Sequence, residues 1–265
     1  MSSKDRVAAM LACVHASPEA VARHDRTAWL GLFSPDAEIH DPVGARPHCG
    51  AIAIARFYDT FIAPNRIVFE VAYEGVCDDT VWRDVTIHTH MATGLSLRVP
   101  AHLRYQLRAQ PSGPCYIRRL CAHWELGSML GQSLRSGWLG LRSNAGLTRH
   151  LLACQGMTGA IGFTRGLGGV GRRGRGRAER LFTALRDGDK AAASAQCAPQ
   201  PTFHVDGVSL ASIDALIEHA RGLQWRKLIA AARQVTASIE TASGHGIALL
   251  TFDKRGRVVQ LRWEF

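Results

Sequence analysis

An internal repeat is the feature that most constrains how this chain can fold. The segment A-E-I-H-D-P-V-G (37–44) has a late counterpart in P-T-F-H-V-D-G (201–207). Each copy closes on a tryptophan motif, A-H-W-E-L (122–126) in the first and L-R-W-E-F (261–265) in the second. The interval from the Asp to the Trp is shorter in the second copy by about one strand with its loops. The pattern predicts a tandem repeat of one folding unit, with the second copy reduced.

The first copy shows helical patterns followed by long alternating ones. Ser17 before Pro18 predicts a helix start, with Ser17 as N-cap. Expected helices span 5–14, 18–32 and 51–61, a short strand spans 36–40, and further strands span 67–76, 80–90, 95–107 and 116–126, with a turn-rich loop at 108–115. Helices followed by antiparallel strands predict an α+β fold, with a curved antiparallel sheet and helices on one face.

The chain divides into three segments by composition. We expect a first domain at 1–126, a helical and Gly/Arg-rich connector at 127–177, and a shortened second domain at 178–265. In the second domain, helices are expected at 178–193 and at 209–220, the latter capped by Ser209, before two closing strand regions. Because about one strand is missing from the count, the second sheet is expected to be open.

Charge and cysteine content restrict the classes of function. The formal net charge is +10, and all but four of the 32 basic residues are arginine. The seven cysteines are odd in number and form no C-x-x-C, which predicts reduced thiols and no metal site. The N-terminus has no apolar signal segment and no run long enough to span a membrane, so a cytoplasmic location is expected.

The string H-D-P-V-G-A-R-P-H-C-G-A-I-A-I-A-R-F-Y (40–58) resembles ketosteroid isomerase and SnoaL-like proteins of the nuclear-transport-factor-2-like superfamily. The resemblance implies a cone-shaped α+β fold, here in two copies, around an apolar pocket. It implies that Asp41 is the base that moves a proton, without a cofactor. Ser17 stands where the isomerases carry a tyrosine on the first helix. It also implies a homodimer, or an internal pseudo-dimer of the two copies.

The polyether epoxide-opening hydrolases and cyclases of the same superfamily offer a second resemblance. They share an E-D-P-V-G-like motif and pair its Asp with a Glu on the strand after the third helix. In this chain Glu70 occupies that strand, in I-V-F-E-V. The resemblance therefore implies a second catalytic carboxyl at Glu70.

Other candidate residues come from strand alternation. Asp84, His88 and His90 share one strand face and are candidate acid–base groups, with a solvent-facing or packing role as the alternative. His102 and Tyr105 have opposite parity, and Tyr105 belongs to the more apolar set, which favours it as a buried hydroxyl donor. The substrate-binding set is predicted to be Phe57, Tyr58, Phe61, His102 and Trp124.

The connector allows several interpretations. G-L-G-G-V-G (166–171) satisfies G-x-G-x-x-G, but no strand precedes it, so no dinucleotide cofactor is expected. The arginine run at 171–180 is compatible with a flexible linker, a contact with anionic lipid or a nucleic-acid contact, and the last lacks aromatic interleaving. The two leading hypotheses are an isomerase, cyclase or epoxide hydrolase acting on an apolar polycyclic or polyketide-like molecule, and a non-catalytic lipid or steroid carrier docked through the connector.

Overall fold

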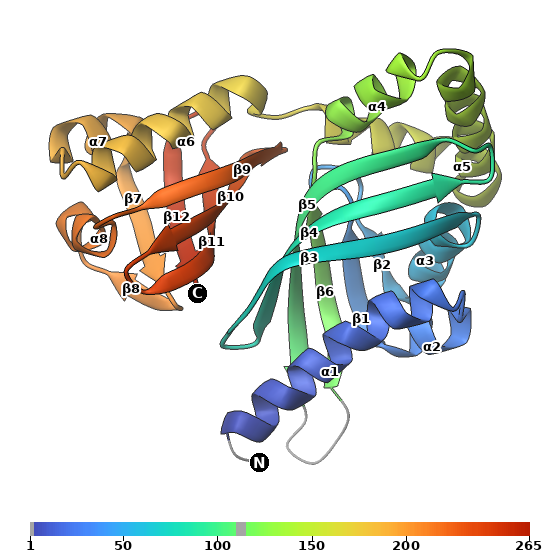
Figure 1. Ribbon diagram of the computed structural model, residues 1–265, viewed down its shortest axis with the longest axis horizontal. Helices are drawn as coiled ribbons and strands as arrows, with labels where there is room; N and C mark the ends of the chain where they lie inside the picture. The colour runs from blue at the N-terminus through green and yellow to red at the C-terminus, as the bar shows by residue number, and fades with distance from the viewer. Residues whose placement is uncertain (1–2, 110–114) are drawn as a thin grey trace. The chain divides into compact units, whose positions relative to one another are not determined.

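The computed structural model describes residues 3–109 and 115–265, which form two compact units (Figure 1). One unit comprises Met1–Ala72 and Asp79–Leu167, and the other comprises Tyr73–Asp78 and Gly168–Phe265. The loop predicted at 108–115 lies mostly outside the described residues. Within the described ranges, no helix is both long enough and apolar enough to cross a bilayer.

The first unit is an α+β cone. Its elements are α1 (Ser3–Ala22), α2 (Arg26–Gly31), β1 (Phe33–His40), β2 (His48–Cys49), α3 (Gly50–Phe57), a π-helical turn at Tyr58–Ile62, β3 (Asn65–Cys77), β4 (Thr80–Met91), β5 (Ser96–Ala109), β6 (Cys115–His123), α4 (Leu126–Arg135) and α5 (Trp138–Thr164). The strand order is β2-β1-β6-β5-β4-β3. Antiparallel pairing of β4, β5 and β6 confirms the α+β prediction, while β1 runs parallel to β6.

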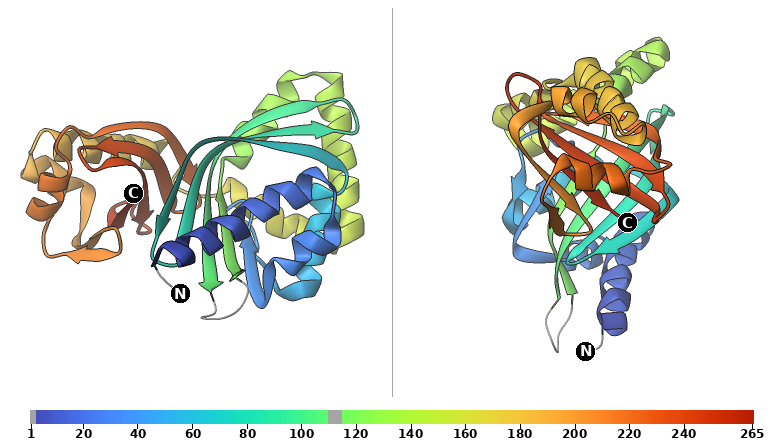
Figure 2. Two further views of the ribbon diagram at one scale, coloured as in Figure 1. Left: turned by 60° about the horizontal axis from the view of Figure 1, so that its bottom comes forward. Right: turned by 90° about the vertical axis from the view of Figure 1, so that its left-hand side faces the viewer.

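Helix α1 lies along one face of this sheet, where it contacts β4, β5 and β6 (Figure 2). The predicted break at Ser17–Pro18 is wrong, because α1 continues from Ser3 to Ala22 with Pro18 inside it. Ser17 is buried, and its hydroxyl accepts a hydrogen bond of 3.1 Å from the indole of Trp29. This tertiary contact keeps Ser17 inside α1, although its local sequence favours the N-cap position of a new helix.

The helices α4 and α5 belong to the first unit, although the sequence suggested a separate connector. Helix α4 contacts β5, and α5 contacts the π-helical turn. Helix α5 is broken at Gly156, whose φ of 69° is a left-handed conformation that glycine adopts without a steric penalty. The segment after β6 therefore covers part of the first unit.

The second unit repeats the first strand for strand. Its elements are α6 (Gly171–Arg186), α7 (Lys190–Gln196), β7 (Cys197–Val205), β8 (Val208–Leu210), α8 (Ile213–His219), β9 (Gln224–Ala231), β10 (Gln234–Thr241), β11 (Gly244–Phe252) and β12 (Val258–Glu264). The strand order β8-β7-β12-β11-β10-β9 matches that of the first sheet, including a parallel β7–β12 pair. The expectation of an open sheet with a missing strand is therefore wrong. The second copy has a counterpart of every strand of the first, and it is shorter because β9, β10, β11 and β12 are shorter than β3, β4, β5 and β6.

Two local predictions for the second unit also change. The Gly/Arg run at 171–177 forms the first turns of α6, although a flexible linker was one of its interpretations. Ser212 caps α8 through a 3.3 Å bond from the Ala215 amide, whereas Ser209, the expected cap, lies in β8. The apolar face of α6 buries Leu181, Phe182 and Leu185 in the core of this unit.

Candidate functional site

The first unit contains a cavity of about 150 Å³ on the face of the sheet that α1 covers. Its walls are mainly aliphatic and aromatic and include Val21, Trp29, Phe57, Phe61, Ile67, Phe69, Ile87, Val99 and Leu103. The polar groups that reach it are few, namely Ser17, Asp41, Thr89, Tyr105 and the indole of Trp124. An apolar pocket with a small number of polar side chains is the common form of a small-molecule site.

Asp41 lies directly after β1 and lines this cavity. Its Oδ1 accepts a hydrogen bond of 2.6 Å from Nε1 of Trp124, which follows β6, and β1 and β6 are hydrogen-bonded neighbours. Burial of the carboxyl raises the pKa of Asp41 to about 6, and the bond from Trp124 partly opposes that rise. The carboxyl is therefore ionised at neutral pH, yet basic enough to accept a proton from a bound molecule.

Tyr105 brings a hydroxyl group into the same cavity from β5. Its phenolic oxygen is hydrogen-bonded by the side chains of Arg83 and Ser17. The Ser17 oxygen also accepts a hydrogen bond from the indole N–H of Trp29. Burial raises the pKa of Tyr105, which keeps the phenol protonated. With donors on its oxygen, the phenol retains its own proton to donate to a ligand.

Alternation along the strands decides which candidates face the cavity. The wall residues Ile67, Phe69 and Ile87 all have odd numbers in β3 and β4. Glu70 and His88 have even numbers and lie on the opposite face of the sheet, where Nε2 of His88 is 2.9 Å from Oε2 of Glu70. Neither lines the cavity, and the expectation that they share a pocket with Asp41 is corrected.

Asp84 and His102 also lie on the opposite face. They are directly opposed in the β4–β5 register, both are fully buried, and Asp84 Oδ1 is 3.9 Å from His102 Nε2. His90, on the same face of β4, contacts Ser96. The predicted pocket roles of Asp84 and His102 are therefore corrected, because the odd-numbered residues of these strands supply the cavity wall.

Of the predicted ligand-contacting residues, Phe57, Phe61 and Trp124 line the cavity. Tyr58 is buried beside Trp29, with ring centroids 5.4 Å apart, and is not part of the wall. Sequence reasoning missed the roles of Trp29 and Arg83. The alternation of Arg83 with Val85 and Ile87 in β4 was the available signal for Arg83, but no pattern pointed to Trp29.

The second unit does not reproduce this arrangement. Asp206, the counterpart of Asp41, is exposed with a φ of 47°, and its Oδ1 accepts from the backbone amide of Phe265 at 2.8 Å. Trp263, the counterpart of Trp124, is buried in the core, and its Nε1 has no hydrogen-bond partner within the described ranges. No group of three potential metal ligands occurs among the described residues of either unit.

The fold and the cavity define the first unit as an α+β cone with an acidic group in an apolar interior. Residues 14–110 match the family model of the SnoaL-like domain. The matched segment falls almost entirely within the first unit, and the second sheet repeats the strand order of the first. No curated protein matches the chain.

Several solved structures are similar to one half of the chain. The Delta 5-3-ketosteroid isomerase from Mycobacterium sp. is 25% identical, with 46% of this chain and 96% of that chain covered and a TM-score of 0.42. A Mycobacterium tuberculosis protein in complex with estradiol-17beta-hemisuccinate is 26% identical over 46% and 96%, with a TM-score of 0.41. An LEH-like epoxide hydrolase from M. tuberculosis is 14% identical over 52% and 96%, with a TM-score of 0.42.

Proposed function

We propose that the first unit is an enzyme that moves a proton within an apolar small molecule, with Asp41 as the base and Tyr105 as the hydrogen-bond donor. The observation that carries the proposal is the Asp41 carboxyl, held by Trp124 in an apolar cavity that raises its pKa to about 6. Tyr105 in the same cavity supplies the second group that such chemistry needs. Neither group requires a cofactor for this step.

The reaction class follows from the two groups. Ionised Asp41 removes a proton from a carbon beside a carbonyl, and the electron pair of that C–H bond moves to the carbonyl oxygen. Tyr105 donates a hydrogen bond to this oxygen as its negative charge develops, which stabilises the enolate. Return of the proton to another carbon completes an isomerisation, and attack of the enolate on a second carbonyl of the molecule completes a cyclisation.

The same pair suits the opening of an epoxide. Asp41 would take the proton of an attacking hydroxyl or water as the new C–O bond forms. Tyr105 would give its proton to the epoxide oxygen as the ring C–O bond breaks. The positions of Asp41 and Tyr105 suit both kinds of reaction, so the test uses a ketone and an epoxide.

The cavity volume guides the choice of probes. A cavity of about 150 Å³ in another protein holds benzene, so a six-membered ring is a suitable size. We would follow the conversion of 3-cyclohexen-1-one to its conjugated isomer by ultraviolet absorbance, and the opening of cyclohexene oxide to the diol by gas chromatography. The proposal expects one of these reactions to exceed the buffer rate and to be lost in Asp41→Asn. If the wild-type chain accelerates neither, or Asp41→Asn retains full activity, the proposal is wrong.

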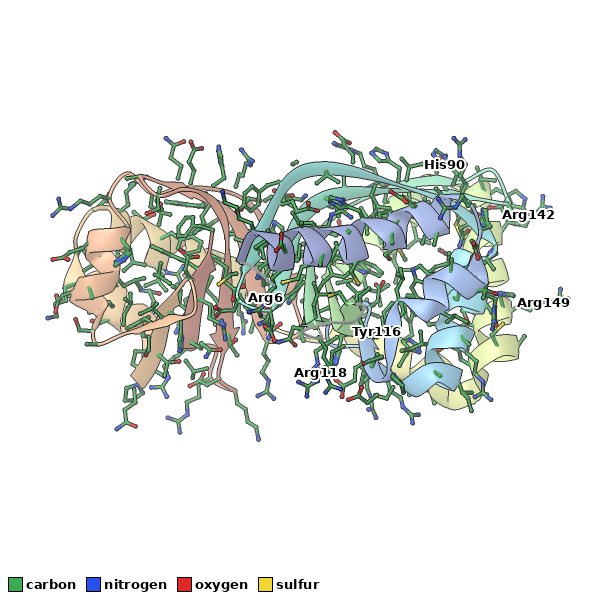
Figure 3. The ribbon with its side chains drawn as sticks, turned by 90° about the horizontal axis from the view of Figure 1, so that it is seen from below. Arg6, His90, Tyr116, Arg118, Arg142 and Arg149 are labelled. Carbon is green, nitrogen blue, oxygen red and sulfur yellow. The ribbon has the colours of Figure 1, made fainter. Side chains whose placement is uncertain are left out.

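A second candidate function is a carrier that holds an apolar ligand in the same cavity and docks to an anionic membrane surface. The observation that favours it is the segment between Glu125 and Glu179, which contains no acidic residue. On α4 and α5, Trp138 is 80% exposed and Leu134 is 55% exposed. Figure 3 shows Arg142 and Arg149 of α5 extending away from the first unit. Exposed apolar groups beside arginines suit the interface of a membrane with acidic headgroups.

Flotation with vesicles tests the carrier. We expect the chain to float with phosphatidylcholine vesicles that contain phosphatidylserine, and to float less in high salt. Trp138→Ser and Arg142→Gln should each reduce the bound fraction, because one removes interfacial apolar area and the other a charge. Equal binding of these variants and the wild type, or no binding to either vesicle, would exclude the docking role.

A further inference from the structure

A second concave site lies in the first unit, outside the Asp41 cavity. It is a groove of about 480 Å³ between the segment Ala45–Cys49, the first turns of α3, and the second half of α5. Its apolar side is formed by Pro47, Ile52 and Phe163. The volume is within the range of ordinary ligand pockets. None of the predicted catalytic residues lines it.

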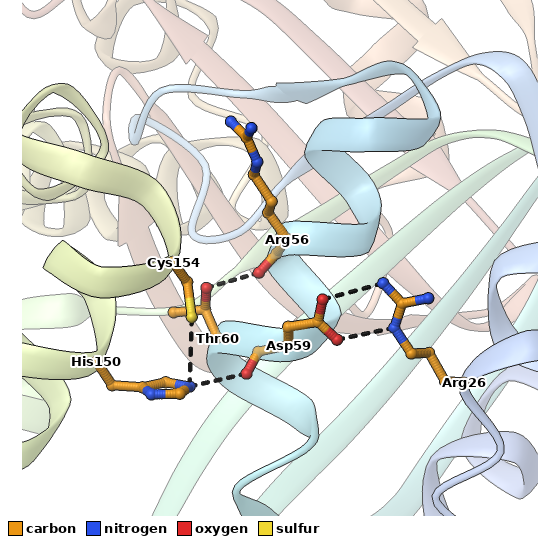
Figure 4. Close-up of polar contacts among 6 residues, drawn as sticks. All are labelled: Arg26, Arg56, Asp59, Thr60, His150 and Cys154. Carbon is orange, nitrogen blue, oxygen red and sulfur yellow. Dashed lines mark hydrogen bonds and ion pairs between the residues drawn. The ribbon is translucent and has the colours of Figure 1, made fainter.

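The groove has a one-sided charge. Arg46 and Arg56 both line it, and no Asp or Glu belongs to its lining. The nearest acidic residue in sequence, Asp59, is already held by Arg26 through bonds of 2.8 and 3.0 Å. Figure 4 shows this pair and the guanidinium of Arg56 turned away from it. Two cations and no carboxylate among the lining residues favour an anionic ligand.

Helix α3 adds to this field. It begins at Gly50, and its N-cap residue, Cys49, makes no side-chain capping bond. Cys49, Ile52 and Ala53 of this end line the groove, so the positive end of the helix dipole lies at the groove wall. The helix end and the two arginines therefore act on the same space.

The backbone fixes the position of Arg46. Its amide N–H donates a 3.0 Å hydrogen bond to the carbonyl oxygen of Gly162 in α5. A Cβ atom at Gly162 would lie 2.7 Å from Cβ of Arg46, so only glycine allows this approach. Helix α5 is held against the other wall by His150, whose Nε2 is 2.9 Å from the Asp59 carbonyl oxygen, as Figure 4 shows. The walls of the groove are thus joined by defined contacts.

The groove and the Asp41 cavity have a common wall. His48, in the groove, packs on Phe57 and Phe61 with ring centroids 5.1 and 6.5 Å apart, and both phenylalanines also line the cavity. On the groove side, Phe61 stacks on Phe163 at 5.5 Å. Burial and nearby Arg46 lower the pKa of His48 to about 4, so this imidazole is neutral and adds no charge.

We propose that this groove is a binding site for a small amphipathic anion, with Arg46 and Arg56 holding its carboxylate or phosphate and Ile52 and Phe163 contacting its apolar body. The proposal concerns the groove alone and holds whether or not Asp41 is catalytic. The class of ligand follows from the two arginines, the helix end and the apolar side. A neutral molecule of the same shape leaves the arginines without a partner and binds more weakly.

The test compares two fluorescent probes of similar ring content, the anionic 8-anilinonaphthalene-1-sulfonate and the neutral N-phenyl-1-naphthylamine. In Arg46→Gln/Arg56→Gln, we expect the dissociation constant of the sulfonate to rise about tenfold or more, because charge-assisted bonds are lost. The constant of the neutral probe should change less than twofold. Arg66→Gln, at an exposed arginine of β3 outside the groove, is the matched control and should bind both probes as the wild type does.

Competition identifies the anionic group. Displacement of the sulfonate by 1-naphthoate indicates a carboxylate, and displacement by 1-naphthyl phosphate indicates a phosphate. The Asp41→Asn variant should bind the sulfonate with the affinity of the wild type. The result for the groove is therefore independent of whether Asp41 is catalytic. Unchanged sulfonate affinity in the double variant, or an equal loss of the neutral probe, would overturn the proposal.

Discussion

The indole N–H of Trp124 donates a hydrogen bond to the carboxyl of Asp41, and Nε1 and Oδ1 are 2.6 Å apart. The two residues follow the neighbouring strands β6 and β1. The two residues are far apart in sequence and are joined because β6 returns to lie parallel to β1. The bond orients a carboxyl whose burial would otherwise raise its pKa further. The pair thus sets both the direction and the basicity of the group proposed to take the proton.

Asp41→Asn should change the stability of the protein in a pH-dependent way. Burial raises the pKa of Asp41 to about 6, above its ordinary value of 3.8. The folded state thus binds the proton more tightly, and stability is lost as the pH rises from about 4 through 6. The Asn variant does not ionise, so we expect it to be more stable than the wild type at pH 8, by up to about 3 kcal/mol. Thermal unfolding should show no such difference near pH 4, and a destabilised variant at pH 8 would contradict the account.

Trp124→Phe should raise the pKa of Asp41 further. The variant keeps an aromatic ring beside the cavity but removes the donor that favours the charged carboxylate. A lost charge-assisted bond corresponds to an upward shift of about one pKa unit. Titration of the aspartate carboxyls by ¹³C nuclear magnetic resonance would measure it. A midpoint that falls, or stays where it is in the wild type, would show that the bond does not tune Asp41.

Tyr105→Phe and Tyr58→Phe form a matched pair. The Tyr105 hydroxyl has partners in Ser17 and Arg83, so its removal should cost about 1 kcal/mol of stability and lower kcat about 100-fold with little change in KM. The Tyr58 hydroxyl is buried without a hydrogen-bond partner in the described part of the chain, so its removal should leave stability equal or higher. Urea unfolding and steady-state kinetics separate the two, and equal effects of both variants would refute the donor role.

His88→Gln and Glu70→Gln test the assignment of the sheet faces. The two side chains contact each other on the face away from the cavity, where both remain partly exposed. Each variant should therefore keep turnover within about twofold and stability within about 0.5 kcal/mol of the wild type. A loss as large as that of Asp41→Asn would mean that this face carries the chemistry.

Much of the first unit could be predicted, because its strands alternate regularly. The expected strands at 67–76, 80–90 and 95–107 fall within β3, β4 and β5 or within two residues of them. Alternation showed that Asp84 and His88 share a face, but the inward face had to be inferred from the apolar set that includes Val85 and Ile87. The sequence interpretation did not use that signal, and it offered Asp84 and His88 as pocket groups although the wall is formed from the other face of β4.

The second unit was harder because local irregularities hide its pattern. Strand β9 was missed: Lys227 has a φ of 52°, and the register of β9 against β10 shifts nearby, so the alternation is interrupted. Ser17 was misread because its contact with Trp29 depends on tertiary structure. The pairing of Trp124 with Asp41 likewise depends on a parallel return that periodicity does not reveal.

The most direct test of the central claim is the pH dependence of 3-cyclohexen-1-one isomerisation by the wild type and by Asp41→Asn. If Asp41 is the base, kcat/KM of the wild type rises with pH through a midpoint near 6 and then levels off, because the ionised carboxyl is the active form. The Asn variant is expected to be at least about 100-fold slower at every pH. A wild-type profile without this midpoint, or a variant as fast as the wild type, would contradict the claim.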